Sequence, residues 1–167
     1  MFYLYKGLSG DASRTVRTAL ALAGQQGCRE ADTGHFLLAM LRCAKGPAAD
    51  FLHRKRVTAA ALQSNAALQQ PSAVPCRLHK NDLACESRKA LEFAVLGAHA
   101  ANRPKAENEH LLCAMLEDAS CTASVWLAAL GVEVAQAARE CRQLSGQTVL
   151  PVQPRMSAPR SNRPSDK

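Results

Sequence analysis

The sequence has few aromatic residues and no long hydrophobic run. Phe, Trp and Tyr make up 4% of the 167 residues, which disfavours a surface that stacks single-stranded nucleic acid on aromatic rings. No run approaches the roughly 18 consecutive apolar residues that a membrane-spanning helix needs, which excludes an integral membrane protein. The apolar opening Met1–Tyr5 is stopped by Lys6 and Gly7 and is too short for a signal-peptide core. We therefore expect a cytoplasmic protein without contact to a membrane.

Motifs for metal, disulfide and nucleotide chemistry are missing as well. The seven cysteines are an odd number with irregular spacing, and no pair has the Cys-x-x-Cys spacing of a zinc or redox site. We expect reduced cysteines that pack as small hydrophobic residues. No Gly-x-x-x-x-Gly-Lys-Ser/Thr phosphate loop is present, so the sequence contains no ATPase module of that type. The sequence indicates no enzyme, no metal and no cofactor.

Helix-forming residues dominate what is present. Ala, Leu, Gln, Arg and Glu are abundant and β-branched residues are sparse, which predicts an all-α fold. The net charge is +7, but the segment 145–167 alone has a net charge of +3 and four of the eight prolines. We expect this segment to be a disordered tail. The rest of the chain is then only modestly basic, which makes nucleic acid an unexpected partner.

The segment 1–69 predicts four short helices. Apolar residues recur three and four positions apart after Ser13, which we expect to cap the first helix. Thr33 and Thr58 have the same capping character, and Pro47 suits the first turn of a helix. The segment 70–82 has two prolines and no apolar period, which predicts a linker.

The second half of the chain repeats the first. We expect the stripe that begins at Val16 in the first helix to return at Ser87, and the later motifs to match after a four-residue insertion. His35 then matches His110, and an Ala-Met-Leu triplet occurs in both copies. Because a unit of about 60 residues buries too little surface to be stable alone, we expect the repeats 12–69 and 83–144 to pack together as one domain, 1–144.

Two motifs in each copy carry a resemblance to a known family. Arg17–Leu20 precedes Asp32–Leu41 in the first copy, and Arg88–Leu91 precedes Glu107–Leu116 in the second. This doubled order resembles the Clp N-terminal domain, the double Clp-N repeat of Clp unfoldases, with its Arg-x-Ala-Leu and Gly-Thr-Glu-His-Leu-Leu-Leu motifs. The resemblance covers 12–144. It implies an all-α fold of eight helices in two pseudo-symmetric four-helix repeats.

The resemblance also implies a function. Because no ATPase module accompanies the double repeat, the chain resembles a stand-alone member of the family. Such domains bind substrates, adaptors or the protease machine and do no chemistry themselves. The implied function is a protein-interaction module that binds substrate segments or adaptors of a Clp chaperone-protease system. The alternative is an accessory structural subunit that docks on a Clp protease ring, as plastid stand-alone members do.

The family motif implies four ligand-binding residues at two helix starts. They are Thr33 and Gly34 in the first copy and Asn108 and Glu109 in the second. In some ClpC proteins the motif glutamates bind phosphorylated arginine. A carboxylate suits a guanidinium because it accepts two parallel hydrogen bonds. Glu109 retains that carboxylate and Gly34 does not, so phosphoarginine binding is implied for the second copy.

Simpler interpretations stand beside these. His35 and His110 lack a neighbouring nucleophile motif, so a structural role at the helix start is favoured over catalysis. Glu109 can serve its helix N-terminus through charge alone. The basic run His53–Arg56 is favoured as a solvated loop, with an acidic partner surface as the alternative.

Overall fold

The structure is a computed structural model that describes residues 5–43, 45–66 and 74–146. These residues form eight α-helices, which confirms the predicted all-α class. The helices are α2 (Gly10–Gln25), α3 (Thr33–Cys43), α4 (Pro47–Arg54), α5 (Ala59–Ala66), α6 (Cys85–Ala100), α7 (Asn108–Glu117), α8 (Thr122–Ala129) and α9 (Val134–Leu144). Residues 147–167 of the predicted tail and residues 70–73 of the predicted linker lie outside the described residues.

Every helix of the first half has a counterpart in the second. In each pair the second helix starts 75 residues after the first. The pairs are α2 with α6, α3 with α7, α4 with α8, and α5 with α9. The expected match of Val16 with Ser87 is therefore wrong, because this offset pairs Val16 with Leu91. The motifs Arg17–Leu20 and Arg88–Leu91 are not at equivalent places either, since Arg17 pairs with Glu92. A shift of four residues is close to one helical turn and leaves an apolar stripe almost unchanged. The expected cap is wrong for the same helix, because Ser9, and not Ser13, accepts a hydrogen bond from the backbone N of Ala12 at 3.2 Å. It is wrong for α3 as well, because Oδ1 of Asp32, and not Thr33, accepts from the backbone N of His35 at 3.0 Å.

Two short backbone bridges join the halves. Leu8 pairs with Ala106, and Ala31 pairs with Leu83. Within these bridges Ala106 donates to the carbonyl of Gly7 at 2.7 Å, and Ala31 donates to the carbonyl of Asp82 at 2.9 Å. In each bridge a residue just before the first helix of one half pairs with the loop between the first two helices of the other half. The two halves are therefore interlocked.

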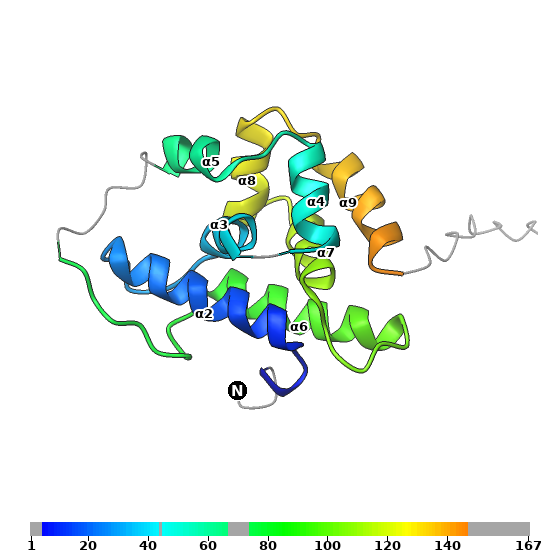
Figure 1. The fold of residues 1–167 in the computed structure, drawn as a ribbon, viewed down its shortest axis with the longest axis horizontal. Coiled ribbons are helices and arrows are strands. Elements are labelled where there is room, and N and C mark those ends of the chain that lie inside the picture. The colour runs from blue at the N-terminus through cyan, green and yellow to red at the C-terminus, as the bar shows by residue number, and fades with distance from the viewer. Residues whose placement is uncertain (1–4, 44, 67–73, 147–167) are drawn as a thin grey trace, which may run out of the picture.

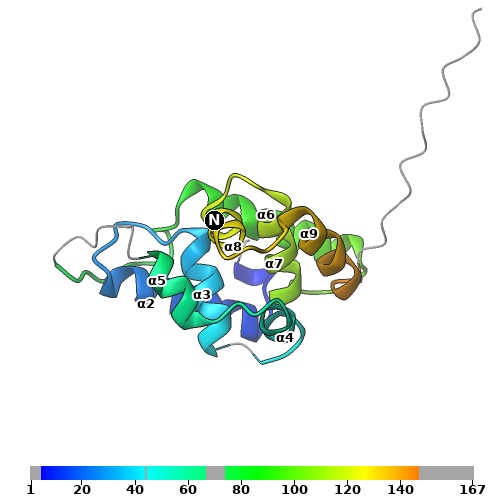
Figure 2. The same ribbon diagram turned by 90° about the horizontal axis from the view of Figure 1, so that it is seen from above.

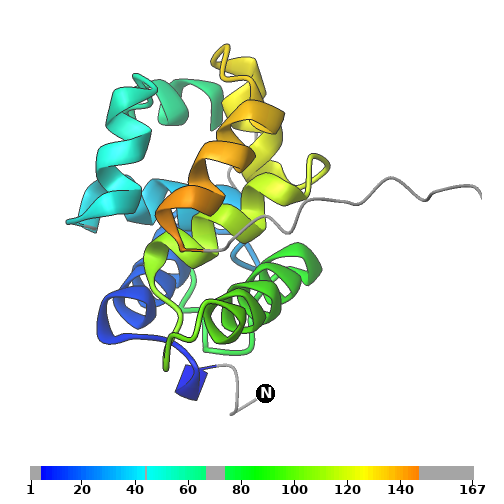
Figure 3. The same ribbon diagram turned by 90° about the vertical axis from the view of Figure 1, so that its right-hand side faces the viewer.

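The core lies around α3 and α7. Figure 1 and Figure 3 show α2 and α6 together on one side of these two helices and the remaining helices on the other. Seen from above, α4 and α9 both lie beside α7 (Figure 2). Leu37, Leu38, Leu111 and Leu112 are at most 1% exposed. Truncating a leucine in such a core to alanine typically costs about 2–5 kcal/mol.

Equivalent turns use different residues in the two halves. Gly131 has a φ of 82°, and its counterpart Arg56 has a φ of 59°. Because both residues have a positive φ, this turn needs a left-handed backbone whichever residue occupies it. Arg56 is the last residue of the predicted basic run. Lys55 of the same run is not freely solvated, since its Nζ lies 2.8 Å from Oε2 of Glu140 on α9. Thr58 caps α5 as expected, because its hydroxyl accepts from the backbone N of Ala61 at 3.2 Å.

Candidate functional site

Two groups of helix N-termini face the long helices α2 and α6 in equivalent ways. The first residues of α3 and α8 meet the first turn of α6. The first residues of α7 and α4 meet the first turn of α2 around a shared cavity. Helix N-termini present unpaired N–H groups and a partial positive charge. Each junction therefore suits an acceptor or an anionic group.

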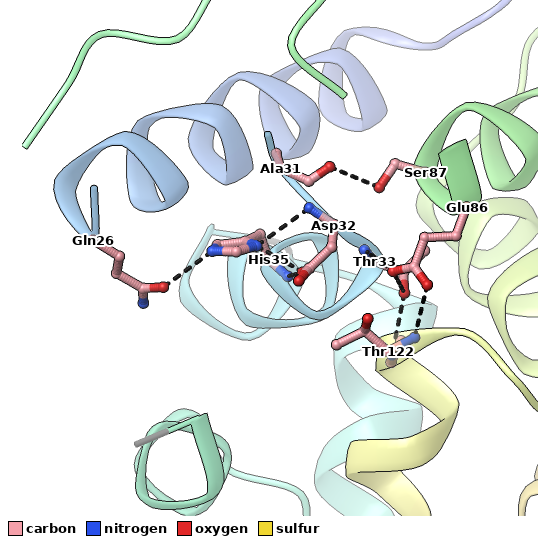
Figure 4. Close-up of polar contacts among 9 residues, drawn as sticks. Gln26, Ala31, Asp32, Thr33, His35, Glu86, Ser87 and Thr122 are labelled. Carbon is pink, nitrogen blue, oxygen red and sulfur yellow. Dashed lines mark hydrogen bonds and ion pairs between the residues drawn. The ribbon is translucent and has the colours of Figure 1, made fainter. Parts of the chain in front are cut away.

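The first group, named the closed junction, consists of Thr33, Glu86 and Thr122. Oε1 of Glu86 accepts hydrogen bonds from the backbone N of Thr33 at 2.9 Å and from its hydroxyl at 2.8 Å. Oε2 accepts from the backbone N of Thr122 at 3.0 Å. Figure 4 shows the Glu86 side chain reaching from α6 to these two helix starts. One carboxylate of the chain thus caps both α3 and α8.

Two of the four predicted ligand residues are buried at this junction. Thr33 is 0% exposed, and its hydroxyl oxygen accepts from the backbone N of Ala123 at 2.9 Å. Gly34 packs against the indole of Trp126, where an added Cβ would lie 2.5 Å from Cζ3. A ligand at this end of α3 would have to displace Glu86 or Trp126.

The second group, named the open junction, consists of Asp11, Pro47 and Asn108, which are the counterparts of Glu86, Thr122 and Thr33 in the pairing of the helices. The Asp11 side chain is one methylene shorter than that of Glu86, and it contacts Arg14 at 3.7 Å on the exposed surface. Pro47 has no backbone N–H to donate. A cavity of about 280 Å³ lies between Asp11, Pro47 and Asn108.

The cavity of the open junction carries charges of both signs. Lys45 and Arg103 line it, and so do Asp11, Glu107 and Glu109. Opposite charges within one small cavity can hold a ligand that is itself both anionic and cationic, each part by charge-assisted hydrogen bonds.

Polar groups at the open junction lack the partners that their counterparts have. Asn108 is 6% exposed, and its Oδ1 atom accepts no hydrogen bond from any described residue. The backbone N–H groups of Asn108 and Ala48 also donate to no described residue. Their counterparts at Thr33 and Ala123 are both hydrogen-bonded. A polar ligand in the cavity would satisfy these groups, which makes the cavity a candidate binding site.

The two motif histidines hold the starts of α3 and α7. Nδ1 of His35 lies 3.3 Å from the backbone N of Asp32, and Nδ1 of His110 lies 3.2 Å from that of Glu107. Both side chains are buried. Burial lowers the pKa of His110 below its ordinary 6.5, an effect that neighbouring Glu109 opposes. These contacts support the structural interpretation of both residues.

Other kinds of site find little support in the described part of the chain. No three or more of its His, Cys, Asp and Glu side chains gather closely enough to hold a metal ion. Three cysteines pack in the core as expected, namely Cys113, Cys121 and Cys141. No single described helix is long and apolar enough to cross a membrane, although α7 and α8 pass that test together as a pair bent by 80°.

Comparison with known proteins shows a shared fold. No family model matches the sequence, and no curated protein is similar enough to match. The Hsp104 N-terminal domain from Candida albicans matches with a TM-score of 0.67 and 19% identity, over 84% of this chain and 93% of that one. The N-terminal domain of the chaperone ClpD from Arabidopsis thaliana matches with a TM-score of 0.64 and 14% identity, over 84% and 95%. A ClpV N-domain in complex with a VipB peptide matches with a TM-score of 0.62 and 14% identity, over 87% and 91%.

The chain therefore has the fold of the N-terminal domains of Clp and Hsp104 ATPases, in agreement with the resemblance of its sequence motifs. The matched domains are covered almost completely, so the likeness concerns the whole double repeat. Asn108 and Glu109, which the sequence predicted as ligand-binding residues, line the cavity of the open junction. The sequence analysis did not identify Asp11, Lys45 and Arg103, which line the same cavity. Extending the match of His35 with His110 back along the chain would have aligned Asp11 with Glu86.

Proposed function

We propose that this chain is a protein-interaction module that binds a segment of a partner protein in the cavity of the open junction. The observation that carries the proposal is the contrast between two equivalent junctions. At one of them Glu86 supplies the acceptor that two helix starts require. At the other, Glu107 accepts from the backbone N of His110 within α7, but Oδ1 and the backbone N–H of Asn108 have no partner among the described residues. A cavity lined by polar and charged groups remains there.

The ligand chemistry follows from that contrast. A phosphate at the place equivalent to the Glu86 carboxylate would accept from the N–H group of Asn108, the counterpart of Thr33, and lie near Lys45 and Arg103. A guanidinium attached to that phosphate would face the carboxylate of Glu109. A phosphorylated arginine side chain combines both groups, and it is the ligand that we propose.

The partner class follows from the fold. The ClpV N-domain that shares this fold forms a complex with a VipB peptide, which supports a peptide segment as the ligand. We assign the segment to substrates or adaptors of a Clp chaperone-protease system. In this assignment the chain acts by binding and carries out no reaction.

Isothermal titration of the full chain with a phosphoarginine peptide tests the proposal. We expect about one site per chain, with an affinity at least tenfold lower for the unmodified arginine peptide. Glu109→Ala should lower the affinity at least tenfold, or about 1.4 kcal/mol. Glu92→Ala, which removes an exposed glutamate of α6, is the matched control and should leave binding unchanged. Two equal sites, or unchanged binding by Glu109→Ala, would refute the assignment.

A second candidate is an accessory subunit that docks on a folded Clp component. The observation that favours it is a pair of large apolar side chains on α6, Phe93 and Leu96, each 62% exposed. Exposed apolar side chains that lie together can form part of a contact surface. Affinity capture with the full chain from the native lysate separates the candidates. If the variant with Phe93→Ser and Leu96→Ser no longer captures one stoichiometric Clp component, docking is favoured. If Glu109→Ala no longer captures many client proteins, segment binding is favoured.

A further inference from the structure

A second cavity lies apart from the open junction, between α2 and the extended segment 75–80. Its volume is about 490 Å³. We name it the basic groove and define it by the lining residues Arg17, Leu20, Arg77, Leu78, His79 and Lys80.

The wall of this groove is held in place at both ends. The backbone N of Cys76 donates to the carbonyl of Gly24 at 2.9 Å. A Cβ at Gly24 would collide with the carbonyl oxygen of Cys76, so only glycine permits this approach. At the other end the hydroxyl of Tyr5 donates to the carbonyl of Lys80 at 2.6 Å. The groove is therefore a preformed feature, which lowers the entropic cost of binding.

The charge of the groove has one sign. Arg17, Arg77 and Lys80 line it, together with a histidine and no acidic residue. The counterpart of Arg17 in the second half is Glu92, so the positive charge at this position is specific to the first half. The floor is apolar, because Leu20 is 6% exposed and Leu78 is partly buried. A basic rim over an apolar floor fits a ligand of opposite charge with an apolar side chain.

We propose that the basic groove binds an extended acidic segment of a partner protein, with one apolar side chain placed between Leu20 and Leu78. The backbone groups of Arg77 and Leu78 form no hydrogen bond with any described residue. They are thus available to pair with the main chain of an extended ligand. The segment 147–167 of this chain is excluded as the occupant by its net charge of +3, because like charges repel.

Fluorescence anisotropy with the full chain tests this proposal. The probe is a labelled peptide of alternating glutamates and leucines at low salt, and the comparison peptide has glutamine in place of every glutamate. We expect the acidic peptide to bind at least tenfold more tightly. Arg17→Glu with Arg77→Glu should weaken it at least tenfold, whereas Arg139→Glu, at an exposed position on α9, should change it less than twofold. Circular dichroism confirms that each variant is folded.

Three outcomes would overturn the proposal. Equal binding of both peptides would show that charge does not select the ligand. Equal weakening by Arg139→Glu would show that the whole positive surface acts, and not the groove. Tighter binding of an oligothymidine, lost in the Arg17 and Arg77 variant, would identify a nucleic-acid surface. Glu109→Ala should leave binding of the acidic peptide unchanged, so this test is independent of the open junction.

Discussion

Glu86 and Asp11 occupy equivalent places on α6 and α2, and only Glu86 reaches the helix starts that face it. Its carboxylate accepts three hydrogen bonds from two residues, Thr33 and Thr122. The carboxylate of Asp11 contacts only Arg14 among the ion pairs of the described residues. One half of the domain therefore uses this position for stability, while the other half leaves polar groups available for a ligand.

The first prediction concerns the stability that Glu86 provides. Glu86→Ala removes three hydrogen bonds to a charged acceptor, two from the start of α3 and one from the start of α8. We expect the free energy of unfolding to fall by about 3 kcal/mol, since hydrogen bonds to charged groups contribute about 1.5–3 kcal/mol each and are not additive. Urea denaturation measures the change. The matched control, Asp11→Ala, should cost less than about 1 kcal/mol. Equal losses in the two variants would contradict the contrast between the junctions.

The second prediction concerns Gly34. An added methyl group would overlap the ring of Trp126, and overpacking of this kind costs about 1–3 kcal/mol. Gly34→Ala should therefore lower the melting temperature. It should also shift the fluorescence of Trp126, which is the single tryptophan of the chain. Gly10→Ala is the control, because a Cβ there meets nothing within 4 Å. If both variants melt like the parent protein, the Gly34 contact is not tight.

Some local features of the fold could be predicted from the sequence and others could not, since Ser9 and not Ser13 caps α2. Pro47 marks the start of α4 and Thr58 caps α5, because proline geometry and side-chain capping act within one turn.

The register between the halves could not be predicted in the same way. A shift of four residues preserves a helical stripe, so the stripe alone matches Val16 to Ser87 as well as to Leu91. The two bridges distinguish these registers, because each joins residues from both halves just before or between the paired helices. They are tertiary contacts, which the period of one helix does not contain.

The candidate site could be predicted only in part. The family motif located Asn108 and Glu109, but it gave no sign that Thr33 and its neighbour are buried. Glu86 covers Thr33 and Trp126 covers Gly34, and both lie far away in the sequence and reach α3 across the interface of the halves. Contacts over such separations arise from the packing of the two halves, and a local motif does not encode them.

The third prediction concerns pH. Burial lowers the pKa of His110 in the folded chain below its ordinary 6.5, against the raising effect of Glu107 and Glu109. The unfolded chain then binds the proton more readily, so the stability due to neutral His110 is present above pH 6.5 and is lost as the pH falls. Melting temperatures between about pH 8 and pH 5 should fall less steeply for His110→Gln than for the parent chain. His99→Gln, at an exposed position, should follow the parent. A steeper fall for His110→Gln would mean that the charged form is favoured.

The fourth prediction concerns the interlocking of the two halves. The bridges pair Ala31 with Leu83 and Leu8 with Ala106, and α3 also contacts α6, α7 and α8 of the second half. A fragment of residues 1–76 would lose both bridges and expose the core side of α3.

We therefore expect this fragment to have low helix content and no cooperative melting transition by circular dichroism, since a unit of this size buries too little apolar surface. The control is the fragment 1–146, which retains every described contact and should melt cooperatively, close to the temperature of the full chain. A sharp independent transition of the 1–76 fragment would show that one repeat is a folding unit by itself.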